Sequence, residues 1–231
     1  MRRFLVVLAA VVFAGVAPSG PAGAAGGGGG GGDLGGAGGG VDRASLDRKI
    51  AARRFERAKQ HIEEAKAAEA KLEAATTDKE RKKLEEEIHD QYDDARDELE
   101  AVVKKQPESY PAHSELGFTL RKLGRFDDSL KAYDRALELK PSYAPAIEYR
   151  GEACLELGRL DDARGAWEKL SKSEPELADQ LLGKMQRWLA RQHSGSPTVD
   201  PNALSEFERW LAEHKISDLP PGFVRSASAG W

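Results

Sequence analysis

Apolar residues recur at intervals of three and four through most of the chain from residue 42 onward, between runs of charged residues. This spacing places the apolar side chains on one face of an α-helix and predicts an all-α protein. A first long helix is expected over residues 42–75, with Asp42 as its N-cap. Its apolar stripe consists of Leu46, Ile50, Ala58, Ile62, Ala65 and Leu72.

A second long helix is predicted to start near Thr77, which has the capping-box spacing to Glu80, and to end before Pro107. Because the connection is short, the two helices should fold back on each other as a long charged hairpin over residues 42–106. A single bent helix and a coiled coil between chains are alternatives that the weak stripe of the first helix leaves open. The stripe of the second helix consists of Leu84, Ile88, Ala95, Leu99 and Val102, with Tyr92 beside it.

A repeated hexapeptide fixes the organisation of the middle of the chain. LGRFDD at residues 123–128 returns as LGRLDD at residues 157–162, after 34 residues. This period is typical of helix–turn–helix repeats. It divides a repeat region, residues 107–177, into two full units, 110–143 and 144–177, and extends backward to a half repeat at 90–106 that merges with the second long helix.

These units resemble the tetratricopeptide repeat family in the positions of their small, aromatic and proline residues. Five positions depart from the family pattern: His113 and Ile147 replace an early Trp, Ser129 replaces Ala, Arg150 replaces Leu, and Cys154 replaces Tyr. The first unit matches at Leu116, Gly117, Leu120, Gly124, Phe126, Tyr133, Ala136 and Pro141. The second matches at Gly151, Gly158, Leu160, Ala163, Trp167 and Pro175.

Each repeated residue type has a physical reason. Gly117 is expected to face Ser129 across the hairpin, and Gly151 to face Ala163, where small side chains let helices approach closely. Gly124 and Gly158 are expected to form left-handed turns between helices.

Acidic residues and prolines mark the helix boundaries within each unit. Asp127 and Asp161 should lie in a first helical turn, where negative charge is favourable. Pro141 and Pro175 should close the two units.

The C-terminal part is predicted to complete the array. We assign residues 178–216 to a capping helix and a last helix, and residues 217–231 to a flexible tail. The capping helix is expected over residues 176–191, followed by a loop over 192–199. The last helix should start with Asp200 as N-cap and Pro201 at its first position.

The N-terminal part has the pattern of an exported bacterial protein. Arg2 and Arg3 precede an apolar run and then Ala24 in a small-x-small sequence, so residues 1–24 are predicted to be a signal peptide cleaved after Ala24. An uncleaved membrane anchor is the alternative. Residues 25–41 are glycine-rich and are expected to be a disordered linker. The mature chain should then be periplasmic or secreted, without an integral membrane span.

Charge and candidate chemistry restrict the function classes further. A net charge of -4 over 231 residues does not favour binding to nucleic acid. The helical pair Glu86 and His89 has the spacing of di-iron ligands, but the second such pair that a di-iron bundle needs is missing. Cys154 falls on an interior repeat position, where packing is expected rather than reactivity. We therefore expect no enzyme activity, metal or cofactor.

The family resemblance implies a right-handed solenoid whose concave surface is lined by the first helix of each unit. It also implies that this groove binds a protein or peptide partner, without giving its identity. The groove positions carried over from the family are Ser114, Phe118, Arg121, Lys122, Glu148, Tyr149, Glu152, Leu155 and Glu156. We therefore expect an exported scaffold or adaptor. The alternative is a homo-oligomeric structural or cell-envelope protein assembled through the N-terminal charged helices.

Overall fold

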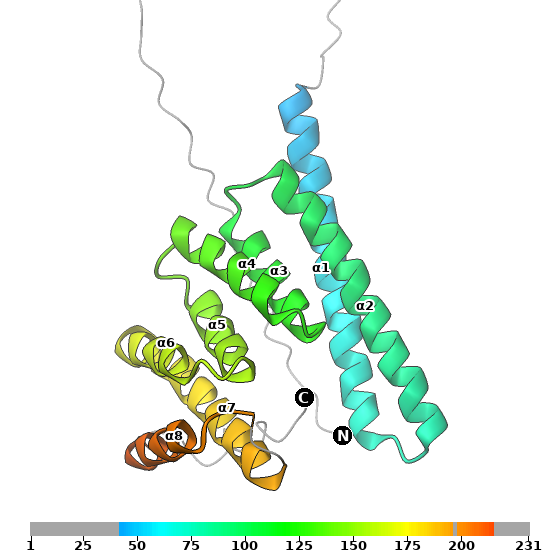
Figure 1. Cartoon of the computed structure of the whole chain (residues 1–231). Helices are drawn as coiled ribbons and strands as arrows, with labels where there is room; N and C mark the ends of the chain where they lie inside the picture. The colour runs from blue at the N-terminus through cyan, green and yellow to red at the C-terminus, as the bar shows by residue number, and fades with distance from the viewer. Residues whose placement is uncertain (1–41, 196–197, 215–231) are drawn as a thin grey trace, which may run out of the picture. The chain divides into compact units, whose positions relative to one another are not determined.

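A computed structural model describes residues 42–195 and 198–214, and within these ranges the chain forms eight α-helices and no strand (Figure 1). The all-α solenoid predicted from the sequence is confirmed. The predictions for the signal peptide, the glycine-rich linker and the tail fall on residues outside these ranges. The helices are α1 (Arg43–Ala74), α2 (Asp78–Lys105), α3 (Tyr110–Lys122), α4 (Phe126–Leu139), α5 (Ala144–Glu156), α6 (Leu160–Ser173), α7 (Pro175–Ser194) and α8 (Pro201–Glu213).

The two long helices α1 and α2 form a hairpin within one chain (Figure 1). Asp42 caps α1 by accepting a hydrogen bond from the Ala44 amide, and Thr77 caps α2 by accepting one from the Glu80 amide at 3.2 Å. Alanines seven residues apart on α1 let α2 approach closely, and Ala51, Ala58 and Ala65 are fully buried. The two helices are therefore separate and packed against each other, and they do not form one bent helix.

The start of α1 differs from the prediction. Leu46 and Ile50 are 48% and 41% exposed, although the periodicity placed them on the apolar stripe. For Leu46 the reason is the length of the partner helix. Asp47 lies level with Lys105, the last residue of α2, to which it forms an ion pair at 3.3 Å. The first turn of α1 therefore extends past the end of α2.

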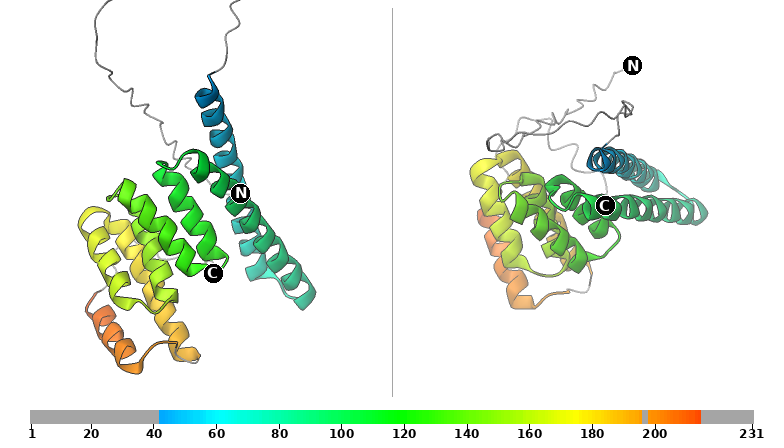
Figure 2. Two further views of the ribbon diagram at one scale, coloured as in Figure 1. Left: turned by 45° about the horizontal axis from the view of Figure 1, so that its top comes forward. Right: turned by 90° about the horizontal axis from the view of Figure 1, so that it is seen from above.

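The repeat units fold as the 34-residue period predicts. Helices α3 and α4 form one hairpin, α5 and α6 the next, α7 packs against both α5 and α6, and α8 packs against α7 (Figure 2). Gly124 and Gly158 adopt positive φ values of 74° and 68°, so the predicted left-handed turns are confirmed. Asp127 and Asp161 lie in the first turns of α4 and α6 as expected.

The helix glycines have different close neighbours from those expected. A Cβ atom at Gly117 would lie 2.6 Å from the Tyr133 ring, and one at Gly151 would lie 2.9 Å from Leu181 and 3.1 Å from Ala166. The predicted partners, Ser129 and Ala163, are not the nearest atoms. At Gly117, the Tyr133 ring lies one turn beyond Ser129 on α4 and reaches back over the glycine, because helical side chains lean toward the N-terminus. At Gly151, a side chain of α7 takes this place.

The capping helix α7 is longer than predicted at both ends. Pro175 serves as its first residue, and residues 192–194, expected in a loop, are helical. The side chain of Gln192 is buried and accepts hydrogen bonds from the Thr198 amide and hydroxyl, at 2.8 and 3.1 Å. This contact holds the connection to α8, where Asp200 caps the helix ahead of Pro201 as predicted.

Candidate functional site

The predicted groove residues lie on α3 and α5, which are the first helices of the two repeats. Helix α1 takes the equivalent place before α3, since it pairs with α2 as α3 pairs with α4, and α7 follows after α5. We call the side of the solenoid formed by α1, α3, α5 and α7 the first-helix surface. Ion pairs link each of these helices to the next.

Two of these ion pairs start from α3. Lys122 contacts Glu69 of α1 at 2.7 Å, with side chains that are 17% and 16% exposed. Arg121 contacts Glu152 of α5 at 2.9 Å, with side chains that are only 7% and 5% exposed. Adjacent residues of one helix therefore reach in opposite directions along the array.

Three further ion pairs connect α5 to α7. Lys184 lies between two carboxylates of α5, at 2.7 Å from Glu148 and in contact with Glu152. Arg191 contacts Glu156 at 2.6 Å, closer to the surface. We refer to the pairs that join α1, α3, α5 and α7 as the charge ladder.

Burial strengthens the interactions between the charges at the centre of the ladder, which are those of Arg121, Glu148 and Glu152. Burial alone would lower the pKa of Arg121, but the neighbouring Glu152 carboxylate raises it, and the net shift is upward. Burial raises the pKa of Glu148, against the opposing effect of Lys184. Removing one member would leave an uncompensated charge in a poorly solvated place, which costs far more than losing an exposed pair.

An aromatic group lies beside the ladder. The rings of Phe118 and Tyr149 are 5.2 Å apart, and Tyr92 of α2 lies 6.1 Å from Phe118 on the other side. The Arg121 guanidinium is 5.4 Å from the Phe118 ring and 5.8 Å from the Tyr149 ring. Rings and cations from neighbouring helices are thus packed in one place.

The nine predicted groove residues fall into two groups by exposure. Three remain partly accessible: Lys122, Tyr149 and Glu156. The other six are buried: Ser114, Phe118, Arg121, Glu148, Glu152 and Leu155. The buried six fix the arrangement of the first helices, and the accessible three face solvent from within it.

Several residues of this surface were missed by the sequence reasoning. Glu69 lies on α1, and Lys184 and Arg191 lie on α7. Neither helix carries the repeat signature, so the 34-residue period could not assign these residues to the groove. Glu115 was also missed. It lies three residues before Phe118 on α3, and this spacing alone places both on one face.

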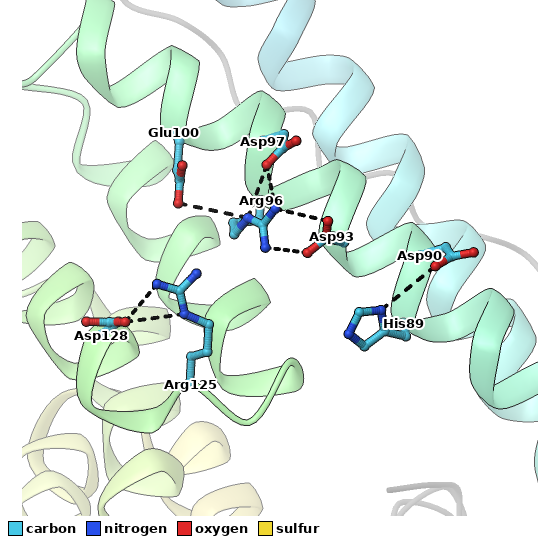
Figure 3. A network of polar contacts seen from close by, with 8 residues as sticks. All are labelled: His89, Asp90, Asp93, Arg96, Asp97, Glu100, Arg125 and Asp128. Atoms are coloured by element: carbon cyan, nitrogen blue, oxygen red, sulfur yellow. Dashed lines mark hydrogen bonds and ion pairs between the residues drawn. The ribbon is translucent and has the colours of Figure 1, made fainter.

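A second polar network lies on α2 and the start of α4 (Figure 3). Arg96 contacts the carboxylates of Asp93 and Asp97, and its Nε lies 4.0 Å from Glu100. Asp128 pairs with Arg125 at 2.8 Å. These pairs are within single helices and mostly solvated, so each contributes little to stability.

Two histidines of the long helices, including His89 of the di-iron-like pair, have contacts other than a metal site. His89 lies 3.8 Å from Asp90, and His61 Nδ1 lies 2.8 Å from the Gln91 side-chain oxygen. No group of three or more potential metal ligands is found among the described residues. Cys154 is fully buried, and burial raises its pKa to about 11, as its interior repeat position predicts.

Comparison with known families is consistent with this architecture. Residues 89–144 and 119–176 each match the family model of the tetratricopeptide repeat. A search of curated proteins gave no match. None of the helices in the described part of the chain is long and apolar enough to cross a membrane.

Proposed function

Because residues 89–176 carry tetratricopeptide repeats, which generally mediate protein interactions, we propose that this chain is a scaffold that binds a protein or peptide partner. The partner would contact the first-helix surface. The observation that carries this proposal is the charge ladder, since buried ion pairs between successive first helices hold the accessible Lys122, Tyr149 and Glu156 in a fixed arrangement. Preorganised side chains lose little entropy when a partner binds.

The assembly alternative has less support. The hairpin of α1 and α2 uses its main apolar stripe within one chain, with Ile62, Leu99 and Val102 all buried. A coiled coil between chains would need that same stripe. We therefore propose the partner contact on the first-helix surface and not on the apolar stripe between α1 and α2.

The direct test is recovery of partners by affinity purification from the producing cells. The combined variant Lys122→Gln, Tyr149→Leu and Glu156→Gln changes the three partly accessible residues and keeps the most buried ladder members, Arg121, Glu148 and Glu152. It does remove the outer ion pairs of Lys122 with Glu69 and of Glu156 with Arg191, which is why its folding is checked below. It should lose partners that the parent retains. Phe118 and Arg121 are too buried for this test, because their loss would disturb the fold itself.

The matched control is Lys131→Gln with Glu138→Gln on α4, whose side chains are 77% and 65% exposed. This control should retain every partner. If the first-helix variant, shown to be folded by circular dichroism, also retains every partner at parental levels, binding through this surface is refuted.

We also propose that the chain is exported and acts in the periplasm or outside the cell. Support comes from the sequence of residues 1–24, with its basic start, apolar run and small-residue site. The intact mass of the protein recovered from its natural host should correspond to a chain that begins at Ala25. Recovery of the unprocessed chain alone, in the cytoplasm, would contradict export.

A further inference from the structure

Glu115 occupies a central place on the first-helix surface. It lies one helical turn before Phe118 on α3, so both side chains project from the same face. That face is flanked by α1, whose Lys66 ammonium is 5.4 Å from the Phe118 ring, and by α5, whose Tyr149 ring is 5.2 Å from it. A partner lying along this surface would therefore pass Glu115.

The cations around the Glu115 carboxylate form ion pairs with other carboxylates. Among the described residues the Glu115 carboxylate itself forms no hydrogen bond and no ion pair. The nearest cations of α1 are already paired along their own helix, Lys66 with Glu63 at 2.9 Å and Lys59 with Glu56 at 3.4 Å. The other cations of the surface are paired in the charge ladder, as Lys122, Arg121, Lys184 and Arg191.

The surroundings of this carboxylate make its lack of a partner costly. Glu115 is partly buried, and burial raises its pKa, while Lys66 and Lys59 lower it and Glu63 raises it. The pKa values of Tyr143 and Tyr149 are raised first by burial, and the Glu115 charge contributes to both shifts. The carboxylate thus lies near Tyr149 of α5 and near Tyr143, the residue that caps the N-terminus of α5, where water can only partly replace a missing donor.

We propose that Glu115 receives a lysine or arginine side chain from the bound partner, with Tyr143 and Tyr149 beside the aliphatic part of that side chain. This inference rests on the proposed function and specifies the chemistry of the partner. A cationic donor satisfies a desolvated carboxylate with a charge-assisted hydrogen bond. The hydrocarbon stems of lysine and arginine pack well against aromatic rings. An acidic partner segment would instead be repelled at this position.

The inference is tested with small probes and the full chain by amide chemical-shift mapping. The probes are N-acetyl-arginine methylamide and N-acetyl-lysine methylamide, and the matched neutral probe is N-acetyl-citrulline methylamide. At least one cationic probe should produce saturable shifts in α3 around Glu115 and at Tyr149. In the Glu115→Gln variant its affinity should fall about tenfold, as expected for the loss of one charged hydrogen bond.

Glu138→Gln on α4 is the matched control and should bind the probe as the parent does. The inference is overturned if no probe gives saturable shifts, if citrulline binds as well as arginine, or if Glu115→Gln binds like the parent. The proposed function is judged separately by partner recovery. If Glu115→Gln keeps all partners while the Lys122, Tyr149 and Glu156 variant loses them, the cation site is refuted and the scaffold function stands.

Discussion

At the scale of single residues, Glu115 and Arg121 show two fates of a charge at the edge of a helical core. Arg121 is more deeply buried but has Glu152 at 2.9 Å and aromatic rings beside its guanidinium. Glu115 is less buried but has no such partner in the described structure. The charge of Arg121 joins α3 to α5 through its ion pair. The charge of Glu115 lowers the stability of the folded protein, because it is partly buried without an ion-pair partner.

Replacing Glu115 by Gln should therefore stabilise the protein at neutral pH, by about 1 kcal/mol. The sign follows from its raised pKa. The folded state holds the proton more tightly than the unfolded state, so the penalty is complete above the folded pKa. It disappears as the pH falls below the unfolded value of about 4.3.

Urea unfolding of parent and variant at a series of pH values measures this difference. The gain in unfolding free energy should be largest near neutral pH and shrink on acidification. Glu138→Gln should change stability by less than about 0.5 kcal/mol. A Glu115→Gln variant that is less stable than the parent at pH 7 would show that the carboxylate has a stabilising partner.

At the scale of elements, the sequence predicted best those features that depend on one residue type at one position, such as helix caps and glycine turns. The caps at Asp42, Thr77 and Asp200 and the glycine turns were all predicted correctly, because each depends on local backbone geometry. The hairpin of α1 and α2 was one of several alternatives. The alanine-rich stripe of α1 did not indicate which helix would pack against it. Tertiary packing decides between these alternatives, and the sequence pattern does not.

Tertiary contacts between repeats were less predictable. The glycine positions at 117 and 151 were recognised, but not that Tyr133 and Leu181 cover them. The nine groove residues were carried over from the family by position, and six of them are buried in the structure. Helix α1 carries no repeat signature, so its contribution of Glu69 and Lys66 to the surface could not be foreseen from the period.

Two glycines that differ in backbone conformation provide a matched test at this scale. A Cβ atom would meet no other atom within 4 Å at either Gly124 or Gly165. Gly124 has φ 74°, so Gly124→Ala should lower the free energy of unfolding by about 1 kcal/mol. Gly165 lies within α6, so Gly165→Ala should raise it by about 0.5 kcal/mol or more.

Thermal unfolding of the two variants reports both effects. Shifts of opposite sign are expected. If Gly124→Ala were neutral, the turn between α3 and α4 would have to adopt another conformation in solution.

At the scale of the whole molecule, the charge ladder connects the N-terminal hairpin, both repeats and α7. Each rung lies between neighbouring first helices, so the ladder makes the stability of one unit depend on the next. This coupling sets the spacing of Lys122, Tyr149 and Glu156. The function proposed for the surface thus depends on contacts that no single repeat contains.

Arg121→Met should accordingly destabilise the protein by about 3 kcal/mol, because it leaves Glu152 with only Lys184 as a partner. Adding Glu152→Leu should recover part of this loss, since no unpaired charge then remains between α3 and α5. Guanidinium unfolding of the two single variants and the double variant gives the coupling free energy. Strictly additive effects would contradict a coupled pair.

The central claim is that a partner binds on the first-helix surface, and site-specific photo-crosslinking in the producing cells tests it most directly. A photoreactive phenylalanine analogue is placed at Tyr149, and for comparison at Lys131 or Glu138 on α4. We predict that a discrete partner adduct forms from position 149 and is absent from both α4 positions. Adducts that form from α4 but not from position 149 would contradict the account.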